Sequence, residues 1–227
     1  MHFRGKHRLL NLVTPTHGTK TAMLGTARIE VQLDDYIGRT IFMGCYEPHN
    51  TRLLRTVLRP GDTFVDVGAN IGYFSLLAAQ LVGPKGAVYA FEPFAQNFAD
   101  LEKNVERNGY LNVKCFGLGC SDTSEPTFIS QIDQRLFPNR TATMVVGPGA
   151  PDHVTEKVDN VRLDNFLLGQ NVSAIRCMKI DTDGWDHKVL LGAKRLLELG
   201  AAGRRRVLDR FQWTHVVGRC LDAYDGR

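Results

Sequence analysis

The sequence lacks any long, uninterrupted apolar run. No segment approaches the roughly 18–20 apolar residues that a transmembrane helix requires. Near the N-terminus, the apolar run at residues 9–13 is interrupted by Asn11, which leaves it too short for the apolar region of a secretory signal. We therefore expect a cytoplasmic protein with no transmembrane segment.

Cysteine is scarce and scattered. The five cysteines are odd in number, and no two of them have the C-x-x-C spacing that is typical of a zinc or redox site. We expect them to be small buried side chains in a reducing compartment.

A strong excess of one charge is also absent, because the net charge is only +4 over 227 residues. The densest basic run, Arg204–Arg206, has no interleaved aromatic side chains and belongs to no nucleic-acid-binding motif. We therefore expect no nucleic-acid partner. Nothing in the sequence indicates the oligomeric state.

A regular alternation of strands and helices begins at residue 63. Continuous apolar runs predict strands at residues 63–67, 87–91 and 112–118, and helical spacing predicts helices at 73–81 and 97–108. This order is typical of an α/β fold, with a mostly parallel sheet and helices on both faces.

The N-terminal part, residues 1–60, is expected to be a leader that packs on a main domain formed by residues 61–227. Within it, the pattern predicts short strands at residues 27–33 and 40–43 and a helix at 50–58.

The second half of the main domain changes character. Residues 123–163 predict an inserted, antiparallel β-hairpin region, because short β-like pieces alternate there with Pro, Gly and Asn. The α/β alternation then resumes, with a short helix at 164–168, a buried strand at 175–180 and a helix at 186–199. Residues 207–208 could begin a further strand.

The segment at residues 64–75, FVDVGANIGYFS, predicts a ligand-binding loop between a strand and a helix. Ligands of parallel α/β sheets bind beyond the carboxyl ends of the strands. Gly68 would let the chain turn sharply with its bare backbone against a ligand, and Gly72 would let the next helix pack closely. Asp66 precedes these glycines at the strand end, and an acidic strand end suits a cationic ligand.

The glycine spacing D-x-G-x-x-x-G lacks the second glycine that brings the backbone against a pyrophosphate in dinucleotide-binding folds. It therefore favours S-adenosylmethionine, which has no pyrophosphate, over NAD. Taken alone, the pattern is also compatible with a plain turn from strand to helix.

Glu92 ends the next predicted strand, 24 residues after Gly68. An acid at this place grips the diol of a ribose, so it indicates a nucleoside ligand without choosing between NAD and S-adenosylmethionine. The alternative is a surface acid beside a proline turn. Ser121 and Asp122, after the third strand, are candidates for the rim of an adenine site.

Several pieces of the sequence, in this order, resemble the FkbM family of methyltransferases. They are GCYEP at 44–48, LRPGDTFVDVGANIG at 58–72, FEP at 91–93, LDNF at 163–166, and MKIDTDG at 178–184 leading to LLGA at 190–193. The resemblance covers roughly residues 40–200. It implies a class I methyltransferase (Rossmann-like) fold and S-adenosylmethionine-dependent O-methylation of a hydroxyl on a sugar, glycolipid or polyketide-type metabolite. By position, Asp66, Gly68, Asn70 and Gly72 would line the cofactor loop and Glu92 would hold the ribose.

Three acids follow the predicted strand at 175–180. Asp181 could act as the base for an acceptor hydroxyl, with Asp183 beside it. Alternatively, Asp181, Asp183 and Asp186 could bind a Mg²⁺ ion that lowers the pKa of the hydroxyl. Without a catalytic role, Asp181 would cap the next helix and Asp183 would lie in a solvated turn. Lys179, within the strand, is expected to pair with an acid such as Asp66 or Glu92.

The C-terminal part departs from the family pattern. The family continues through a further strand, a helix and a closing hairpin, whereas only 43 residues follow Gly184 here. We therefore expect an incomplete C-terminal edge of the sheet. An alternative function follows: a cofactor-binding protein of the same fold with impaired catalysis. A nucleotide-dependent oxidoreductase is disfavoured by the missing G-x-G-x-x-G.

Overall fold

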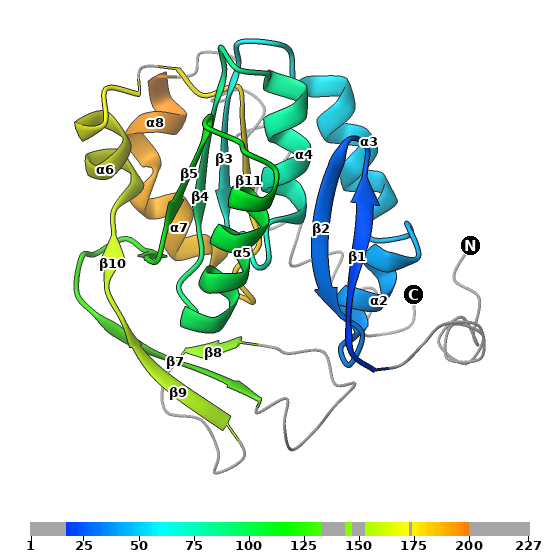
Figure 1. Cartoon of the computed structure of the whole chain (residues 1–227). Helices are drawn as coiled ribbons and strands as arrows, with labels where there is room; N and C mark the ends of the chain where they lie inside the picture. The colour runs from blue at the N-terminus through cyan, green and yellow to red at the C-terminus, as the bar shows by residue number, and fades with distance from the viewer. Residues whose placement is uncertain (1–16, 133–143, 147–152, 173, 200–227) are drawn as a thin grey trace, which may run out of the picture.

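The computed structural model describes residues 17–132, 144–146, 153–172 and 174–199 (Figure 1). The basic run Arg204–Arg206 and the strand predicted at 207–208 lie outside the described residues. Within the described ranges, no helix has both the length and the apolar character needed to cross a bilayer.

Four parallel strands form the central sheet, as the alternating pattern predicts. They are β3 (Thr63–Val67), β4 (Ala87–Phe91), β5 (Val113–Phe116) and β11 (Cys177–Ile180), in the order β11-β3-β4-β5. Lys179 lies opposite Asp66 across the pair β11–β3. Because the strands are parallel, the loops that follow Val67, Phe91 and Ile180 meet at one edge of the sheet.

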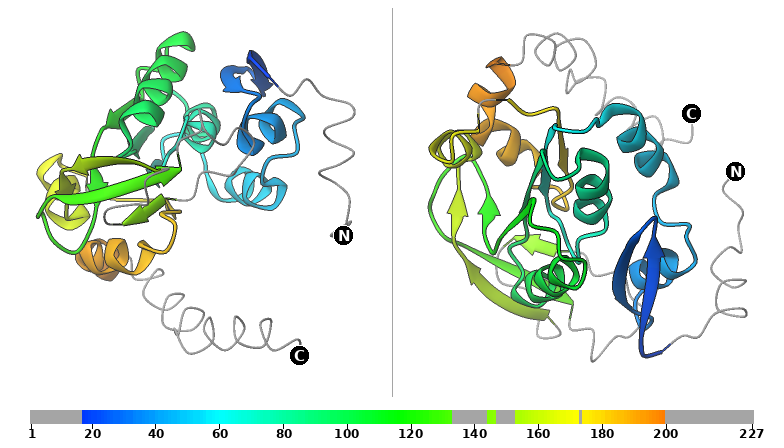
Figure 2. Two further views of the ribbon diagram at one scale, coloured as in Figure 1. Left: turned by 90° about the horizontal axis from the view of Figure 1, so that it is seen from below. Right: turned by 45° about the horizontal axis from the view of Figure 1, so that its top comes forward.

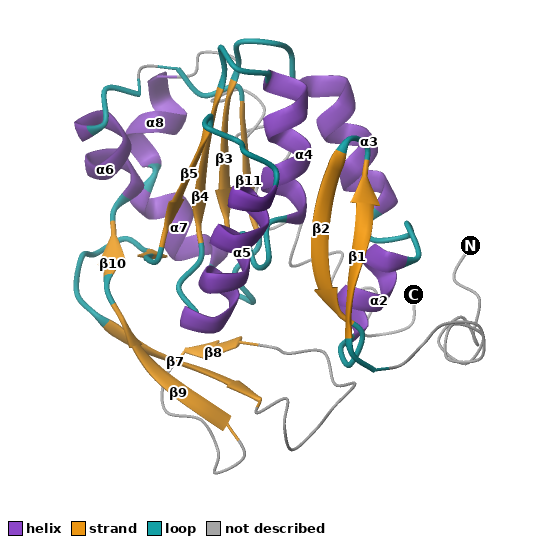
Figure 3. Cartoon of the chain, viewed as in Figure 1, coloured by secondary structure: helices purple, strands orange, loops and turns teal. Residues whose placement is uncertain are grey.

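Helices cover both faces of this sheet, as expected for the fold (Figure 3). On one face, α4 (Tyr73–Val82) and α5 (Ala95–Arg107) pack on Phe64, Val88 and Ala90. On the other face, α6 (Leu163–Gly169) and α7 (Asp186–Gly192) pack on Val65, Val67 and Phe91. The side chains of β3 alternate between the two cores because successive residues of a strand point to opposite faces.

The single helix predicted at residues 186–199 is wrong, since the structure has α7 followed by a separate helix, α8 (Lys194–Leu199). The backbone leaves the helical conformation at Ala193. The buried carboxylate of Asp164 then accepts hydrogen bonds from the backbone N–H groups of Arg195 (3.1 Å) and Leu196 (2.9 Å). It thus satisfies donors that a helix start leaves free, which stabilises a new helix at this point.

An antiparallel hairpin, β1 (Thr19–Leu24) and β2 (Ala27–Gln32), opens the described part of the chain. The strand predicted at 27–33 is therefore confirmed, and its buried residues Ala27, Ile29 and Val31 share one core with α4. The predicted pattern did not indicate β1. Helix α3 (Pro48–Val57) matches the helix predicted at 50–58.

The strand predicted at residues 40–43 is wrong, because this stretch belongs to helix α2 (Tyr36–Phe42). The side chain of Asp35 accepts a hydrogen bond from the backbone N–H of Gly38 at 2.7 Å, which caps the helix. In addition, the hydroxyl of Thr40 donates to the carbonyl of Ile37. The helix that starts after Asp35 therefore continues through residues 40–42, despite their short β-like pattern.

The antiparallel pairing predicted within residues 123–163 is found in a small sheet of order β8-β7-β9, made of β7 (Thr127–Ile132), β8 (Met144–Val146) and β9 (His153–Val158). A short parallel pair, β6 (Gly119–Cys120) and β10 (Asn160–Val161), joins it to the main body. The β1–β2 hairpin and the β7–β9 sheet flank α5 on opposite sides (Figure 2).

Candidate active site

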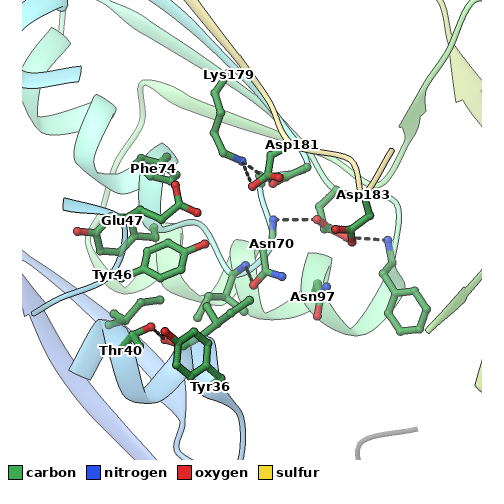
Figure 4. Close-up of a pocket in the computed structure, with 18 of the residues that line it drawn as sticks. Tyr36, Thr40, Tyr46, Glu47, Asn70, Phe74, Asn97, Lys179, Asp181 and Asp183 are labelled. Carbon is green, nitrogen blue, oxygen red and sulfur yellow. Dashed lines mark hydrogen bonds and ion pairs between the residues drawn. The ribbon is translucent and has the colours of Figure 1, made fainter. Parts of the chain in front are cut away.

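A pocket of about 330 Å³ lies at the carboxyl ends of β3, β4 and β11, beside the N-terminal segment that contains α2 (Figure 4). Its volume is in the range of small-molecule sites, and its place is where parallel sheets bind ligands. The polar and charged residues that line it are Tyr36, Thr40, Tyr46, Glu47, Asn70, Tyr73, Glu92, Asn97, Lys179, Asp181 and Asp183.

Unusual backbone conformations gather around this pocket. Among the described residues, four that are not glycine have a positive φ. Three of them line the pocket: Glu47 (φ 37°), Asn70 (φ 51°) and Asp183 (φ 49°). Such conformations cost about 1–3 kcal/mol each and concentrate at functional sites. Their clustering is a second reason, besides the position at the sheet edge, to consider the pocket a candidate functional site.

Gly68, the first residue after β3, lies beside Asp181, the first residue after β11. Its φ is +75°, and an added Cβ would stand 2.0 Å from the carbonyl oxygen of Asp181. The backbone N–H groups of Gly68 and Ala69 both donate to the carbonyl of Phe91. This approach requires glycine, as expected, and it leaves the backbone of Gly68 on the wall of the pocket.

Gly72 serves packing and does not line the pocket. It precedes α4 with φ +94°, and an added Cβ would lie 2.8 Å from a methyl carbon of Leu101 on α5. Gly72 therefore allows close packing, but the close neighbour is Leu101 of α5 and not the strand β3 that precedes the loop.

Asp66 lies beneath the pocket and does not line it. Its side chain is fully buried, and the hydroxyl of Ser75 donates to Oδ2 at 2.7 Å. Oδ1 has no well-directed hydrogen bond among the described residues, but the ammonium of Lys179 lies 3.4 Å away. The ion pair thus compensates the charge of Oδ1, and the expected pairing of Lys179 with Asp66 is confirmed.

Lys179 connects three parts of the site. Its ammonium donates to the carbonyl of Gly68 at 3.0 Å and lies 3.5 Å from Oδ2 of Asp181. The side chain is only 15% exposed, and the nearby carboxylates of Asp66 and Asp181 raise its pKa against the opposing effect of burial. Lys179 therefore stays charged and links Asp66, beneath the pocket, to Gly68 and Asp181, which line it.

Glu92 borders the pocket at the end of β4, as the sequence predicts for an acid facing a nucleoside. Oε2 accepts from the backbone N–H of Asn70 (2.8 Å) and Oε1 from that of Phe94 (3.0 Å). Burial raises the pKa of Glu92 to about 7, although these hydrogen bonds, with Asn97 and Lys179, act to lower it. A carboxylate has about four acceptor positions, so the hydrogen bonds from Asn70, Phe94 and Asn97 leave room for a ligand hydroxyl.

The three acids after β11 do not converge. Asp181 and Asp183 line the pocket, and the Asp181 side chain is 54% exposed. Asp186 instead accepts from the backbone N–H and the hydroxyl of Thr182, at 3.0 and 2.7 Å. Within the described residues, no group of three metal-ligating side chains is placed to hold a metal ion. The arrangement does not fit a Mg²⁺ site on these three acids.

Ser121 and Asp122 lie away from the pocket. The buried Ser121 donates to Asp122, whose carboxylate pairs with Lys188 of α7 at 3.0 Å. The hydrogen bond from Lys188 lowers the pKa of Asp122. The residues just before them, 118–120, line a smaller pocket of about 30 Å³ on the other side of Gly68.

Sequence reasoning from the residues missed the N-terminal wall of the pocket. The ring of Tyr46 meets that of Tyr73 edge-on, with centroids 4.9 Å apart. Burial, together with the carboxylates of Glu47 and Asp181, raises the pKa of Tyr46 well above its ordinary value. The only signal was the segment at 44–48, which carries part of the family resemblance. Its proximity to β11 depends on the packing of α2 and α3.

Comparison with known proteins identifies relatives of this chain. Residues 66–217 match the model of the methyltransferase FkbM domain. The 31-O-demethyl-FK506 methyltransferase FkbM of Streptomyces tacrolimicus is 45% identical over 183 residues, which cover 70% of this chain and 68% of the relative. Methyltransferase 1 of Beauveria bassiana is 28% identical, over 73% of this chain and 68% of its own length.

Among solved structures, an S-adenosylmethionine-dependent methyltransferase from Aquifex aeolicus aligns with 31% of this chain and 37% of its own length. The sequence identity is 26% and the TM-score is 0.27. The alignment thus spans well under half of either chain.

Proposed function

Because the chain belongs to the FkbM family of S-adenosylmethionine-dependent methyltransferases, we propose that it methylates a hydroxyl group of a sugar, glycolipid or polyketide-type metabolite. The observation that carries this proposal is the contact between two loops. Gly68 approaches the carbonyl of Asp181 so closely that no side chain fits between them. A cofactor on the first loop and an acceptor at the second would therefore be neighbours.

The cofactor side of the pocket is assigned to Gly68, Asn70 and Glu92. Gly68 offers bare backbone, and Glu92 offers a buried carboxylate for the ribose hydroxyls. Asp66 and Gly72 act on this side indirectly, through the Lys179 ion pair and the packing of α4. When bound, S-adenosylmethionine supplies a methyl group that is activated by a sulfonium. These residues bind and orient, and proximity alone can lower such a barrier by up to ~7–11 kcal/mol.

The acceptor side is assigned to Asp181, with Asp183 beside it. Asp181 lines the pocket, is half exposed, and is oriented by the ammonium of Lys179. It would accept the proton of the acceptor hydroxyl as the hydroxyl oxygen takes the methyl group, whose bond to the sulfonium sulfur would break and leave S-adenosylhomocysteine as the second product. A positioned base of this kind typically contributes ~10²–10⁴-fold to the rate. No step is assigned to Mg²⁺, because Asp186 is engaged by Thr182.

The charge of the pocket favours a neutral acceptor. Among the described residues, its charged lining consists of Glu47, Glu92, Asp181 and Asp183 against one cation, Lys179. This excess of negative charge suits a cationic cofactor and repels phosphate or carboxylate groups on an acceptor. A neutral hydroxylated metabolite satisfies both conditions. The name of the FK506-methylating relative supports a polyketide-type acceptor in particular.

Calorimetric titration tests the cofactor assignment. The protein is expected to bind S-adenosylmethionine and not NAD, and Glu92→Ala is expected to weaken that binding strongly. Asp122→Ala is the matched control. Asp122 is also an acid that lies just after a strand, β6, but it does not line the pocket. Absence of binding to the wild type, or equal affinity in both variants, would overturn the assignment.

Turnover tests the reaction itself. Release of S-adenosylhomocysteine is measured with a panel of neutral hydroxylated acceptors and with carboxylated or phosphorylated versions of the same compounds. We expect turnover with the neutral compounds, unchanged by EDTA. Preference for the anionic versions would contradict the acceptor assignment. Cofactor binding without turnover on any acceptor would favour the alternative of a catalytically impaired member of the family.

A further inference from the structure

The loop at residues 68–72 is held from three directions by buried polar side chains. Lys179 donates to the carbonyl of Gly68, and Glu92 accepts from the N–H of Asn70. The third is Asn104 of α5, whose Nδ2 donates to the carbonyl of Ile71 at 3.0 Å. Unlike the first two, Asn104 does not line the pocket. Its contact with the loop therefore has no direct role in holding a ligand.

The same amide of Asn104 also binds the N-terminal hairpin. Oδ1 accepts from the backbone N–H of Glu30 at 2.7 Å, and Nδ2 lies 3.3 Å from the carbonyl of Glu30. Asn104 is only 1% exposed, so its amide cannot exchange these partners for water. One side chain thus joins β2, 74 residues away, to the loop that follows β3, 33 residues away.

Asn108, which caps the C-terminal end of α5 four residues later, provides a natural comparison. Oδ1 accepts from the N–H of Arg28 and Nδ2 donates to its carbonyl, both at 2.7 Å. Four residues of helix rise about 6 Å and two residues of strand about 6.6 Å, so the two amides match alternate peptides of β2. Both asparagines attach the hairpin to α5, but of these two side chains only that of Asn104 hydrogen-bonds to the loop within the described part of the chain.

We propose that Asn104 is a positioning residue for the 68–72 loop, and that through it the β1–β2 hairpin sets the affinity for S-adenosylmethionine. The inference rests on the proposed cofactor assignment of this loop. In this arrangement, the hairpin is a support of the cofactor site, because displacing β2 moves the amide that holds the carbonyl of Ile71.

The test compares Asn104→Asp with Asn108→Asp. Each carboxylate still accepts from the strand N–H but can no longer donate to a carbonyl. Asn104→Asp should lose more thermal stability than Asn108→Asp, because Asn104 is buried and makes the additional hydrogen bond to Ile71, so both affinities are measured well below the two melting temperatures. The Kd for S-adenosylmethionine should rise about tenfold in Asn104→Asp and stay within about twofold in Asn108→Asp. If either variant fails to fold, Asn104→Ser and Asn108→Ser replace the pair with the same expectation.

Amide hydrogen exchange of the wild type gives a second measurement that needs no variant. Coupling is reciprocal, so S-adenosylmethionine should slow exchange at Glu30, which binds Asn104, more than at Arg28, which binds Asn108. Equal Kd values in the two variants, or equal protection at the two amides, would overturn the role of Asn104. No binding to the wild type would instead overturn the cofactor assignment, and this inference with it.

Discussion

The loop after β3, residues 68–72, and the loop after β11, residues 181–185, lie against each other at one edge of the sheet but are held by different kinds of contact. The first is held by side chains that are 22, 33 and 111 residues away along the chain. In the second, the side-chain hydrogen bonds are local, with Asp186 accepting two from Thr182, four residues away, while a backbone hydrogen bond joins Asp181 to Val67.

This difference teaches how the two halves of the site divide their tasks. The first loop is fixed by three side chains of distant elements, which suits the proposed cofactor surface because an ordered surface loses little entropy on binding. The second leaves Asp181 half exposed at the rim, as suits a group that meets the acceptor. The comparison predicts that substitutions in the first loop affect binding, whereas those in the second affect turnover.

The largest expected effect is on turnover and comes from Asp181→Asn. Removing the proposed base should lower kcat by about 10²–10⁴-fold, while the Kd for S-adenosylmethionine changes by less than about threefold. Steady-state kinetics with an acceptor found in the turnover panel measures the first, and calorimetry the second. Asp183→Asn is the matched control and should keep most of the activity. If Asp183→Asn were the more damaging variant, the proton acceptor would have to be reassigned.

The next effect is on binding and comes from Gly68→Ala. The methyl group would meet the carbonyl of Asp181, and alanine disfavours a φ of +75°. The Kd for S-adenosylmethionine should rise by at least about a hundredfold. Gly61→Ala controls for backbone strain alone, since Gly61 has φ +90° and no atom near the added methyl. A similar loss of affinity in both variants would show that strain, and not the contact of the two loops, is responsible.

A smaller effect concerns pH and Glu92. Burial raises the pKa of this acid to about 7, so it is partly protonated near neutral pH before the cofactor binds. In the proposed complex, the ionised carboxylate accepts hydrogen bonds from the ribose hydroxyls and attracts the cationic cofactor. The Kd for S-adenosylmethionine should therefore fall about tenfold from pH 6 to pH 8. Glu92→Gln should flatten this dependence, which calorimetry across that range would measure. A slope that persists in Glu92→Gln would assign the titration to another group.

The same shift has a consequence for the stability of the protein without cofactor. The folded state holds the proton of Glu92 more tightly than the unfolded state, in which the pKa is near its ordinary value of 4.5. Stability from this group is therefore present below about pH 4.5 and is lost as the pH rises to about 7. Comparing the pH dependence of unfolding in the wild type and in Glu92→Gln isolates this contribution.

The smallest effect is expected at the local contact of the second loop. Asp186→Ala removes the acceptor for Thr182 and should reduce the free energy of unfolding by about 1 kcal/mol. The Kd for S-adenosylmethionine should not change, because Asp186 does not line the pocket. Chemical denaturation and calorimetry measure the two quantities. A marked loss of cofactor affinity would show that the two loops are coupled more tightly than their contacts suggest.

Much of the fold was predictable because the central elements have unambiguous patterns. The runs at 63–67 and 87–91 coincide with β3 and β4, since strands covered on both faces are mostly apolar, with the ion-paired Asp66 as the exception in β3. Prediction failed where a carboxylate side chain that caps a helix start overrode the pattern. Asp35 starts α2 in a stretch with β-like composition, and Asp164 starts α8 within a continuous helical pattern from 31 residues away.

The candidate site was predictable only in part. Glu92 and Asp181 follow strands, so their place at the pocket could be inferred from the parallel order. Asp66 precedes the end of β3, where it points into the core that contains α4. The wall formed by Tyr46 and Glu47 could not be derived from local pattern, because only the packing of α2 and α3 brings it to the sheet.

The sequence by itself determined the parallel sheet, the glycine loop at its edge and the family to which the chain belongs, because each is encoded in a contiguous pattern. The tertiary structure alone decided which acids face the pocket and which support it from below. It also decided that one amide, Asn104, joins the hairpin to the loop. Such roles depend on the directions of single side chains between elements distant in the chain, and no periodicity in a sequence encodes those directions.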